Sequence, residues 1–215
     1  MAVELAHPGV KARGQTLKRL VDILGASAGL ILAAPIIVLT GLWIKASTGN
    51  QVFFRQERVG KDGKSFYMFK FATMRSMTGE EFQRFLERHP AQRLEYEQFQ
   101  KLAHDPRLTP VGRLLRHTSL DELPQLWNVL KGDMSLVGPR PFLPEQAAMY
   151  GRVLDLYVQV RPGITGLWQV SGRNCLSFQQ RVDCDLSYLE NWSLMLDISI
   201  LLRTPLAIFS QKGAY

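Results

Sequence analysis

ILGASAGLILAAPIIVLTGLWI, residues 23–44, is the stretch that decides how the chain is organised, because its 22 residues include no charged side chain. As a straight helix it would be about 33 Å long, enough to cross the hydrocarbon core of a bilayer. Pro35 divides it into residues 23–34 and 35–44, each roughly one leaflet deep as a helix. A proline in a helix interior removes one hydrogen bond and clashes with the preceding turn, so the sequence predicts a break or bend at Pro35.

Basic side chains flank this apolar segment on both sides, at Lys11, Arg13, Lys18, Arg19, Lys45, Arg55, Arg58, Lys61 and Lys64. The positive-inside rule therefore gives no orientation for a span, but it is satisfied if both ends stay on the cytoplasmic face. Two interpretations stay open: a re-entrant helix that dips in, bends at Pro35 and returns, or a kinked transmembrane helix. Gly25 and Gly29 have the spacing of a small-residue helix contact, which is compatible with a homodimer.

The charge of the chain is distributed unevenly. Its 215 residues suit one ordinary domain. Residues 1–75 carry 11 Lys and Arg against four Asp and Glu, whereas residues 76–215 carry 15 of each. The whole net charge of +7 thus lies beside the apolar segment, which favours a membrane surface as partner and argues against nucleic acid. The two cysteines and four histidines lack metal-ligand spacing, so neither a disulfide scaffold nor a zinc site is predicted.

Residues 58–65, RVGKDGKS, are similar to a phosphate-binding P-loop at first sight. That motif requires glycine where the chain has Arg58, and it requires a helix to follow. Residues 51–59 and 66–71 instead have the composition of strands, and Asp62-Gly63 is typical of a tight turn between two strands. The sequence therefore predicts a β-hairpin, whose basic tip could lie against anionic headgroups.

The rest of the chain predicts several helices. Residues 80–89 and 91–104 form two charged amphipathic segments, and Asp105-Pro106 should end the second. Residues 177–191 predict a helix that buries Phe178, Val182 and Leu189. Residues 194–209 are apolar but interrupted by charges and a proline, which indicates a core helix or one lying in the membrane interface. The predicted fold class is mixed α/β and mainly helical, with a Pro-broken re-entrant membrane helix, a small hairpin and amphipathic interfacial helices.

The densest polar chemistry lies in residues 116–132, RHTSLDELPQLWNVLKG. Helical spacing relates its apolar residues Leu123, Leu126, Trp127 and Leu130. Because Pro124 is tolerated only in a first turn, Asp121 and Glu122 should lie at the helix N-terminus, where the dipole favours carboxylates and phosphate. Two interpretations stay open: Ser119 and Glu122 form a capping box, or the acidic pair is functional.

Two rigid basic loops follow this segment. Residues 132–141, GDMSLVGPRP, place Arg140 between two prolines, and residues 161–173, RPGITGLWQVSGR, begin and end with arginine. Proline beside arginine restricts the backbone and prepares the guanidinium group to bind phosphate. Two carboxylates, several arginines and a Mg²⁺ ion would together suit phosphoryl transfer.

These motifs resemble those of the bacterial sugar transferases, the monotopic polyprenyl-phosphate phosphoglycosyl transferases, from about residue 17 to residue 204. The resemblance rests on KRLVD at 18–22, FFRQERVG at 53–60, KF at 70–71, DPR at 105–107, SLDELPQLWN at 119–128, GPRP at 138–141, RPGITGLWQ at 161–169 and NWS at 191–193. The SGRN stretch at 171–174 is most similar to the hexose-1-phosphate transferases. The chain is expected to be their catalytic core alone, without the additional transmembrane helices.

The resemblance implies an activity. A sugar 1-phosphate would pass from a UDP-sugar to undecaprenyl (polyprenyl) phosphate, with release of UMP, through a covalent phosphosugar–aspartate intermediate that initiates bacterial glycan assembly. Asp121 would be the nucleophile and a Mg²⁺ ligand, and Glu122 its partner in acid/base chemistry. Substrate contacts are implied for Arg116, Arg140, Lys70 and Arg173.

The resemblance also implies a place in the cell and a domain division. Residues 1–47 would be a basic N-terminus and re-entrant membrane helix bent at Pro35, and residues 48–215 a cytosolic, membrane-associated catalytic domain. The protein would be monotopic in the inner membrane, with its active site on the cytoplasmic face. Two positions depart from the family pattern: Ala34 replaces a residue that is often polar, and Ala72 replaces an arginine.

Two other functions are compatible with the same residues. A metal-dependent phosphatase or nucleotidase could use the two carboxylates, and it would release phosphate without a lipid acceptor. A non-catalytic, membrane-anchored scaffold could hold anionic lipids with its Arg-Pro loops, and it would tolerate the loss of the Asp121 carboxylate.

Overall fold

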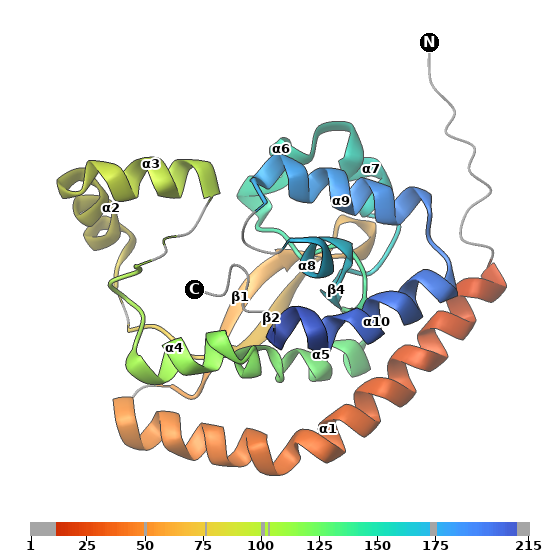
Figure 1. Cartoon of the computed structure of the whole chain (residues 1–215), viewed down its shortest axis with the longest axis horizontal. Helices are drawn as coiled ribbons and strands as arrows, with labels where there is room; N and C mark the ends of the chain where they lie inside the picture. The colour runs from red at the N-terminus through yellow and green to blue at the C-terminus, as the bar shows by residue number, and fades with distance from the viewer. Residues whose placement is uncertain are drawn as a thin grey trace.

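The computed structural model describes residues 12–49, 51–75, 77–99, 102, 104–172 and 176–209. This part of the chain is mainly helical and holds two small two-stranded sheets, which confirms the predicted mixed, mainly helical class. Helix α1 runs along one side of a body formed by the other elements (Figure 1). In chain order the elements are α1 (Ala12–Thr48), β1 (Phe53–Val59), η1 (Lys61–Gly63), β2 (Ser65–Phe71), α2 (Gly79–Arg88), α3 (Pro90–Phe99), α4 (Pro110–His117), η2 (Leu120–Glu122), α5 (Gln125–Lys131), β3 (Ser135–Val137), η3 (Pro144–Gln146), α6 (Ala147–Tyr150), η4 (Gly151–Val153), α7 (Leu154–Tyr157), β4 (Gly163–Thr165), α8 (Leu167–Ser171), α9 (Phe178–Glu190) and α10 (Leu194–Phe209).

The apolar segment lies within α1, which continues through Pro35 rather than ending there. The helix bends around the body of the molecule (Figure 1), and Pro35 is exposed. An exposed proline keeps its ring and its missing hydrogen bond away from the packed face, so it can bend a helix without disturbing the core. By length and composition α1 could cross a membrane. The re-entrant path stays a prediction.

One face of α1 packs against the body and the rest is exposed. Residues on the packed face recur four or seven positions apart, at Asp22, Ala26, Ala33, Thr40 and Ile44. A Cβ atom added to Gly25 would lie 2.6 Å from Leu136 Cδ1, and one added to Gly29 would lie 3.2 Å from Leu126 Cδ1. Both glycines therefore let α1 approach β3 and α5 of its own chain. They give no support to the homodimer, which stays a prediction.

The predicted hairpin is confirmed. Strands β1 and β2 pair antiparallel along their full lengths, and the turn between them is η1. Within that turn Asp62 has φ 59° and Gly63 has φ 70°, the left-handed conformation that Asp and Gly tolerate best. A strand, not a helix, follows the turn, so the P-loop interpretation is wrong.

Asn128 of α5 fixes the hairpin beside the acidic segment. Its Oδ1 accepts a hydrogen bond from the Phe69 N–H at 3.0 Å, and its Nδ2 donates to the Tyr67 carbonyl at 2.8 Å. Asn128 is fully buried, so both hydrogen bonds are protected from water. They hold β2, and with it Lys70, against α5 and the turn that precedes it.

A second sheet joins the two basic loops, and the sequence did not predict it. Strands β3 and β4 pair in parallel, with Ser135 opposite Gly163 and Val137 opposite Thr165. The backbones approach so closely that a Cβ atom on Gly163 would lie 2.1 Å from the Gly138 nitrogen. The loop that carries Arg140 is therefore fixed directly to the segment that begins at Arg161.

Helices α2 and α3 form a small unit with its own hydrophobic cluster. Phe82, Leu86 and Leu102 are its buried members. The predicted second helix, over 91–104, ends earlier, at Phe99. Leu102 instead packs into the cluster, and Asp105 holds Arg107 through its carboxylate. A helix that continued to residue 104 would move Leu102 and Asp105 away from these contacts.

The two C-terminal helices are close to their predicted bounds. Ser177 caps α9 through a hydrogen bond from the Gln180 N–H, and Val182 is buried with Phe178 and Leu189 packed around it, as predicted. Helix α10 is continuous through Pro205. Its exposed apolar residues form one stripe: Met195, Ile198, Leu202 and Leu206. This amphipathic face is compatible with the predicted helix in the membrane interface.

Gly112 in α4 is where the backbone packs most tightly, and this leads to a stability prediction. A Cβ atom there would lie 1.9 Å from the Thr73 carbonyl oxygen. We expect Gly112→Ala to lower the free energy of unfolding by about 2–3 kcal/mol and Tm by about 5–10 °C, measured by thermal unfolding in detergent. Gly79→Ala is the control, because nothing lies within 4 Å of its added Cβ atom. Equal Tm values for the two variants would contradict this packing.

Candidate active site

The acidic pair lies in the 3-10 turn η2, between α4 and α5. Ser119 precedes it with φ 57° and makes no capping hydrogen bond with its side chain, so the capping-box interpretation is wrong. Helix α5 begins after Pro124 and ends at Gly132, which has φ 97°. Asp121 and Glu122 thus precede the helix rather than forming its first turn.

The buried face of α5 agrees with the predicted one at Leu126 and Leu130, which pack against the core, and differs from it at Trp127. Trp127 is 56% exposed, and the buried residues are Gln125, Asn128 and Val129. The reason is that α5 lies between the hairpin and α1, so polar side chains on this face meet backbone groups of β2 and the neighbouring pocket. Apolar periodicity alone could not show that amides would be buried here.

Asp121 is the buried carboxylate of the pair, 6% exposed. Lys70 of β2 lies beside it, with its Nζ 3.9 Å from Asp121 Oδ2 and 2.6 Å from Glu122 Oε1. Burial raises the pKa of Asp121 to about 6, and the positive charge of Lys70 opposes that rise. Near neutral pH Asp121 is therefore an ionised carboxylate with little solvent around it, which favours nucleophilic attack.

Arg116 approaches the same carboxylate from the last turn of α4. Its Nε donates a hydrogen bond to Thr73 Oγ1 at 3.1 Å. Burial lowers the pKa of Arg116, and attraction to Asp121 opposes that shift. Arg116 and Lys70 therefore both place positive charge near Asp121.

Three of the predicted site residues line one pocket. Lys70, Glu122 and Arg140 surround it with Gln125 and Gln169. Its empty volume, including space open to solvent, is about 210 Å³. The positive charges of Lys70 and Arg140 in its wall suit a phosphate group. Asp121 does not line the pocket itself, but Lys70 and Glu122, which do, lie beside it. Arg173 lies outside the described residues.

Sequence reasoning missed a group of polar side chains around Arg140. Their buried atoms have no hydrogen-bond partner within the described part of the chain: Arg58 Nε, Gln125 Nε2, Trp168 Nε1, Gln169 Oε1, Arg181 Nε and Nη2, and Asp185 Oδ1. Buried polar atoms normally have partners, so such a concentration indicates a site for a polar ligand. Gln125 and Gln169 belong to the motifs DELPQ and GLWQ, so the sequence could have identified them as site residues. Nothing in the local sequence distinguishes Arg181 from a surface arginine.

Positive charge accumulates around Arg140. Its guanidinium carbon lies 4.9 Å from the centre of the Trp168 ring, and that of Arg181 lies 5.2 Å from the same ring. Burial, and next repulsion by Arg140, lower the pKa of Arg58 to about 10 and that of Arg181 to about 10. A bound anion would relieve this repulsion, as expected for a phosphate site.

The backbone of Arg140 is held independently of its guanidinium group. Tyr157 donates a hydrogen bond from its hydroxyl to the Arg140 carbonyl at 3.0 Å. The carboxylate of Asp185 lies near Arg140, and its Oδ2 accepts a hydrogen bond from the Tyr150 hydroxyl at 3.1 Å. Burial raises the pKa of Asp185 to about 7. Through Tyr157, helix α7 therefore keeps Arg140 at the pocket.

The acidic pair has a donor set that fits Mg²⁺. Among the described residues no cluster of three or more His, Cys, Asp or Glu side chains could hold a metal ion. Mg²⁺ does not need such a cage, because it commonly binds one or two carboxylates together with water and substrate phosphates. Asp121 and Glu122, beside a pocket that suits phosphate, meet that requirement.

The chain is similar to known proteins along most of its length. The family model described as bacterial sugar transferase matches residues 13–211. The chain is 43% identical over 216 residues to an undecaprenyl-phosphate galactose phosphotransferase of Salmonella typhimurium. The aligned region covers 100% of the chain and 45% of that protein. The chain is 42% identical over 206 residues to the exopolysaccharide production protein ExoY of Rhizobium meliloti. This aligned region covers 96% of the chain and 91% of that protein. A UDP-glucose:undecaprenyl-phosphate glucose-1-phosphate transferase of Xanthomonas campestris is 40% identical over 197 residues. The chain thus spans less than half of some relatives and most of others.

Proposed function

The chain belongs to the bacterial sugar transferase family, and on that basis we propose that it transfers a sugar 1-phosphate from a UDP-sugar to undecaprenyl phosphate. Two relatives are named as undecaprenyl-phosphate sugar phosphotransferases, and these names support the proposed reaction. The observation that carries the proposal is the buried carboxylate of Asp121 beside Lys70, next to a pocket lined by Arg140.

In the first step a carboxylate oxygen of Asp121 attacks the β-phosphorus of the UDP-sugar. A bond forms between that oxygen and phosphorus, and the bond from phosphorus to the bridging oxygen breaks. UMP leaves with the electron pair, and the sugar phosphate stays on Asp121. Because the carboxylate is held out of water by burial and stays ionised near neutral pH, it needs no base to become a nucleophile.

In the second step an oxygen of undecaprenyl phosphate attacks the phosphorus of the aspartyl intermediate. The bond between phosphorus and Asp121 breaks, so the carboxylate is regenerated and the product is a lipid diphosphate sugar. Division into two displacements lets UMP leave before the large lipid enters, so one small pocket can serve both substrates in turn.

The neighbouring side chains have separate roles in this proposal. Glu122 accepts a hydrogen bond from Lys70, which keeps the ammonium group between the two carboxylates. Arg116 and Arg140 would bind donor phosphates from two sides, and Arg173 would be a further contact. Guanidinium groups stabilise the charge that develops during phosphoryl transfer.

Mg²⁺ would be held by Asp121, with Glu122 nearby, and by the phosphates of the donor. When bound it would neutralise part of the diphosphate charge. The two carboxylates and the adjacent pocket, which suits a phosphate group, support this assignment.

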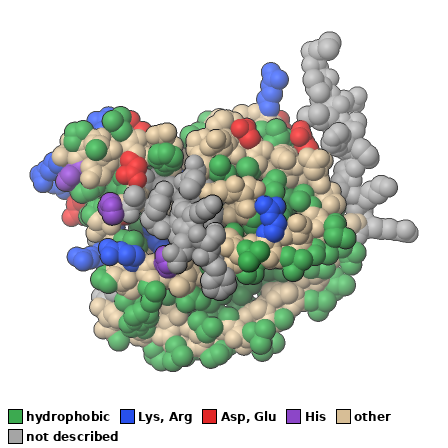
Figure 2. All heavy atoms as spheres, in the orientation of Figure 1, with side chains coloured by type: hydrophobic (Ala, Val, Ile, Leu, Met, Phe, Trp, Pro, Cys, Tyr) green, Lys and Arg blue, Asp and Glu red, His purple; other side chains and the backbone are tan. Residues whose placement is uncertain are grey.

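The site would work at a bilayer surface. Figure 2 shows hydrophobic side chains gathered along the edge where α1 lies, and Leu32, Ile31 and Leu39 are among the most exposed of them. Such a large exposed apolar surface favours contact with lipid. We infer that α1 enters the cytoplasmic leaflet of the inner membrane as a re-entrant helix bent at Pro35. Residues 48–215 would then form a catalytic domain on the cytoplasmic face.

The two departures from the family pattern bear on this proposal. Ala34 is exposed on α1 and offers no hydroxyl group at the bend. Ala72 follows β2, and its N–H donates to the Val52 carbonyl at 2.9 Å. With alanine in place of arginine two residues after Lys70, we expect donor preference to differ from that of relatives that carry the arginine.

The pH dependence of activity tests the assignment of Asp121. Since only the ionised carboxylate attacks, kcat/KM should fall tenfold per pH unit below about pH 6, measured at a fixed Mg²⁺ concentration. The positive charge of Lys70 stabilises the ionised carboxylate of Asp121, so Lys70→Gln should raise the pKa of Asp121, move the acid limb to higher pH and lower kcat/KM at pH 7. An acid limb at the same pH in this variant would show that Lys70 does not act on the titrating group.

A donor panel tests the function. Purified protein, Mg²⁺ and undecaprenyl phosphate would be mixed with a series of UDP-sugars, and UMP and lipid-linked sugar would be measured. We expect one or two donors to yield both products, with sugar appearing on the lipid. Release of free sugar phosphate or inorganic phosphate without the lipid would instead favour a phosphatase or nucleotidase. No reaction with any donor would favour a scaffold.

A further inference from the structure

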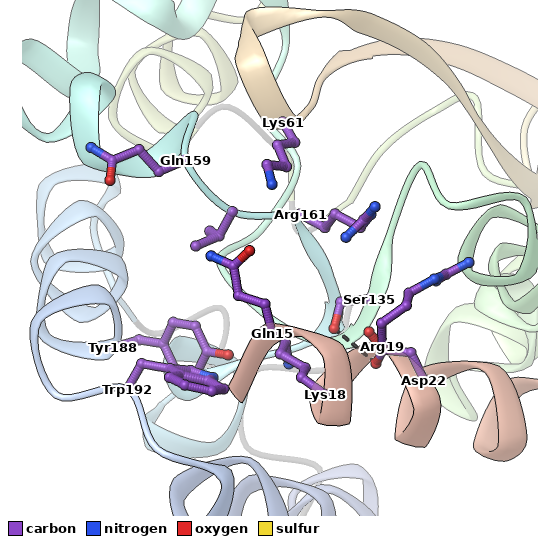
Figure 3. Close-up of a pocket in the computed structure, with 11 residues that line it drawn as sticks. Gln15, Lys18, Arg19, Asp22, Lys61, Ser135, Gln159, Arg161, Tyr188 and Trp192 are labelled. Atoms are coloured by element: carbon purple, nitrogen blue, oxygen red, sulfur yellow. Dashed lines mark hydrogen bonds between the residues drawn. The ribbon is translucent and has the colours of Figure 1, made fainter. Parts of the chain in front are cut away.

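A larger pocket lies away from the acidic pair, at the N-terminal end of α1. Its empty volume, including space open to solvent, is about 460 Å³, against about 210 Å³ for the pocket beside the acidic pair. Four separate parts of the chain meet around it: α1, the hairpin tip, the segments next to β3 and β4, and the end of α9 (Figure 3). The lining residues that matter here are Gln15, Lys18, Arg19, Lys61, Arg161 and Trp192.

The walls of this pocket carry an excess of positive charge. Four cations line it, Lys18, Arg19, Lys61 and Arg161, against one carboxylate, that of Asp22. Asp22 is occupied, because it accepts hydrogen bonds from the Ser135 hydroxyl and the Leu136 N–H, both at 2.9 Å. The structure therefore concentrates cations here without matching acidic groups in the wall.

Some of these cations hold the fold together. Lys18 pairs with Asp197 of α10 at 2.5 Å, and Arg19 donates to the carbonyls of Val129 and Leu130 at the end of α5. These contacts explain why α1 is fixed to the body, and they leave little of the two side chains for a ligand.

Lys61 and Arg161 remain available. Within the described residues the ammonium group of Lys61 has no hydrogen bond or ion pair, and Figure 3 shows it pointing from the hairpin tip into the pocket. Arg161 donates its Nε to the Gly132 carbonyl at 2.7 Å, which fixes the guanidinium plane while its two terminal nitrogens make no described contact. Gln15 points toward Lys61 from α1 (Figure 3). A guanidinium group with two terminal nitrogens to donate and an ammonium group without a described partner suit a phosphate anion.

The position of the pocket points to the source of that anion. The exposed apolar surface of α1 begins beside it, at Leu17 and Leu20, which are 48% and 51% exposed. Trp192 lies over the start of α1, since a Cβ atom added to Gly14 would be 3.2 Å from its ring, and tryptophan is enriched where protein meets headgroups. If the exposed apolar surface of α1 enters lipid, a pocket at this end of the helix lies beside the lipid phosphates.

This pocket is separate from the acidic site. Lys61 lies at the hairpin tip, whereas Lys70 lies near the other end of β2, which places them about 20 Å apart along the strand. The two pockets share no lining residue, although Arg161 of one and Gly163 of the other are two positions apart in the chain.

We propose that the pocket between Lys61, Arg161, Gln15 and Trp192 binds a phosphate group, supplied by the headgroup of an anionic phospholipid. This second site would hold the N-terminal end of α1 at the height of the headgroups. It does not depend on the proposed transferase activity.

The test measures lipid binding by the full chain in detergent. Native mass spectrometry would follow titration with phosphatidylglycerol, phosphatidylcholine or inorganic phosphate. Lys61→Gln should weaken the binding of phosphatidylglycerol about five- to tenfold. Lys64→Gln is the matched control, since it removes the same charge from the same hairpin but does not line the pocket. Thermal unfolding would establish that both variants are folded.

The arms of the experiment separate the sources of phosphate. Phosphatidylglycerol retained in excess inorganic phosphate identifies the ligand as lipid. If inorganic phosphate displaces phosphatidylglycerol from wild type but not from Lys61→Gln, the phosphate site is supported. Its ligand is then a soluble anion and not a lipid. Equal binding by wild type and Lys61→Gln, or equal binding of phosphatidylcholine and phosphatidylglycerol, would overturn the proposal.

Discussion

Asp121→Asn should abolish the formation of lipid-linked sugar, with UMP release reduced at least about a thousandfold. The amide has nearly the same shape as the carboxylate but lacks a nucleophilic oxygen anion, so the first displacement cannot occur. UMP release would be followed with the best donor of the panel, in the presence of Mg²⁺ and undecaprenyl phosphate.

A second carboxylate provides the control for that variant. Asp155 lies exposed in α7, so Asp155→Asn makes the same change of charge away from the pocket and should leave UMP release unchanged. Retention of more than a tenth of the activity in Asp121→Asn would show that another group attacks the donor.

Arg140→Gln is expected to lower kcat/KM by about 10²–10³. Arg140 lines the pocket beside Lys70 and Glu122, and its guanidinium group would bind the phosphate oxygens that gain charge during transfer. The loop should keep its place in the variant, because Tyr157 holds the carbonyl of residue 140 and not its side chain, and Pro139 accepts a backbone hydrogen bond from Gly163. Steady-state kinetics with varied donor concentration would measure the loss.

Two further variants make the Arg140 prediction specific. Arg140→Lys keeps a positive charge but loses the fork of two donors, so it should recover only part of kcat/KM. Arg152→Gln removes an exposed arginine from η4, away from the pocket, and should have wild-type kinetics. A loss in Arg152→Gln as large as that in Arg140→Gln would mean that total charge, not contact with phosphate, determines the rate.

Local sequence was sufficient where local chemistry determines structure. Asp62-Gly63 predicted the hairpin turn because few other residue pairs accept two left-handed conformations. Ser177 and Gln180 marked the start of α9 because they satisfy each other's backbone N–H groups. The motifs also identified Lys70, Glu122 and Arg140, which the structure brings to one pocket, and Asp121 beside them.

Local sequence was insufficient where distant segments decide the outcome. Ser119 and Glu122 have the spacing of a capping box, but the sharp turn between α4 and α5 gives Ser119 a left-handed conformation that prevents it. Arg58 and Arg181 are far apart in the chain, and only the fold brings both near Arg140. The parallel pairing of β3 with β4 depends on contacts that no local pattern records.

Some properties of the apolar segment could be predicted from local sequence and others could not. Its composition predicts association with lipid, and the exposed face of α1 agrees with that prediction. Its path through the membrane stays a prediction, because a helix that continues through Pro35 is compatible with either a spanning or a re-entrant path. Gly25 and Gly29 pack within the chain, which their spacing alone could not reveal.

The most direct test of the central claim is the mass of the protein during the first step. The protein would be mixed with Mg²⁺ and the preferred UDP-sugar in the absence of undecaprenyl phosphate, quenched in acid and analysed by intact and peptide mass spectrometry. The proposed mechanism predicts a species heavier by one sugar phosphate, with the added mass on the peptide that contains Asp121 and absent from Asp121→Asn. UMP release without any such species, or the added mass on a different residue, would contradict it.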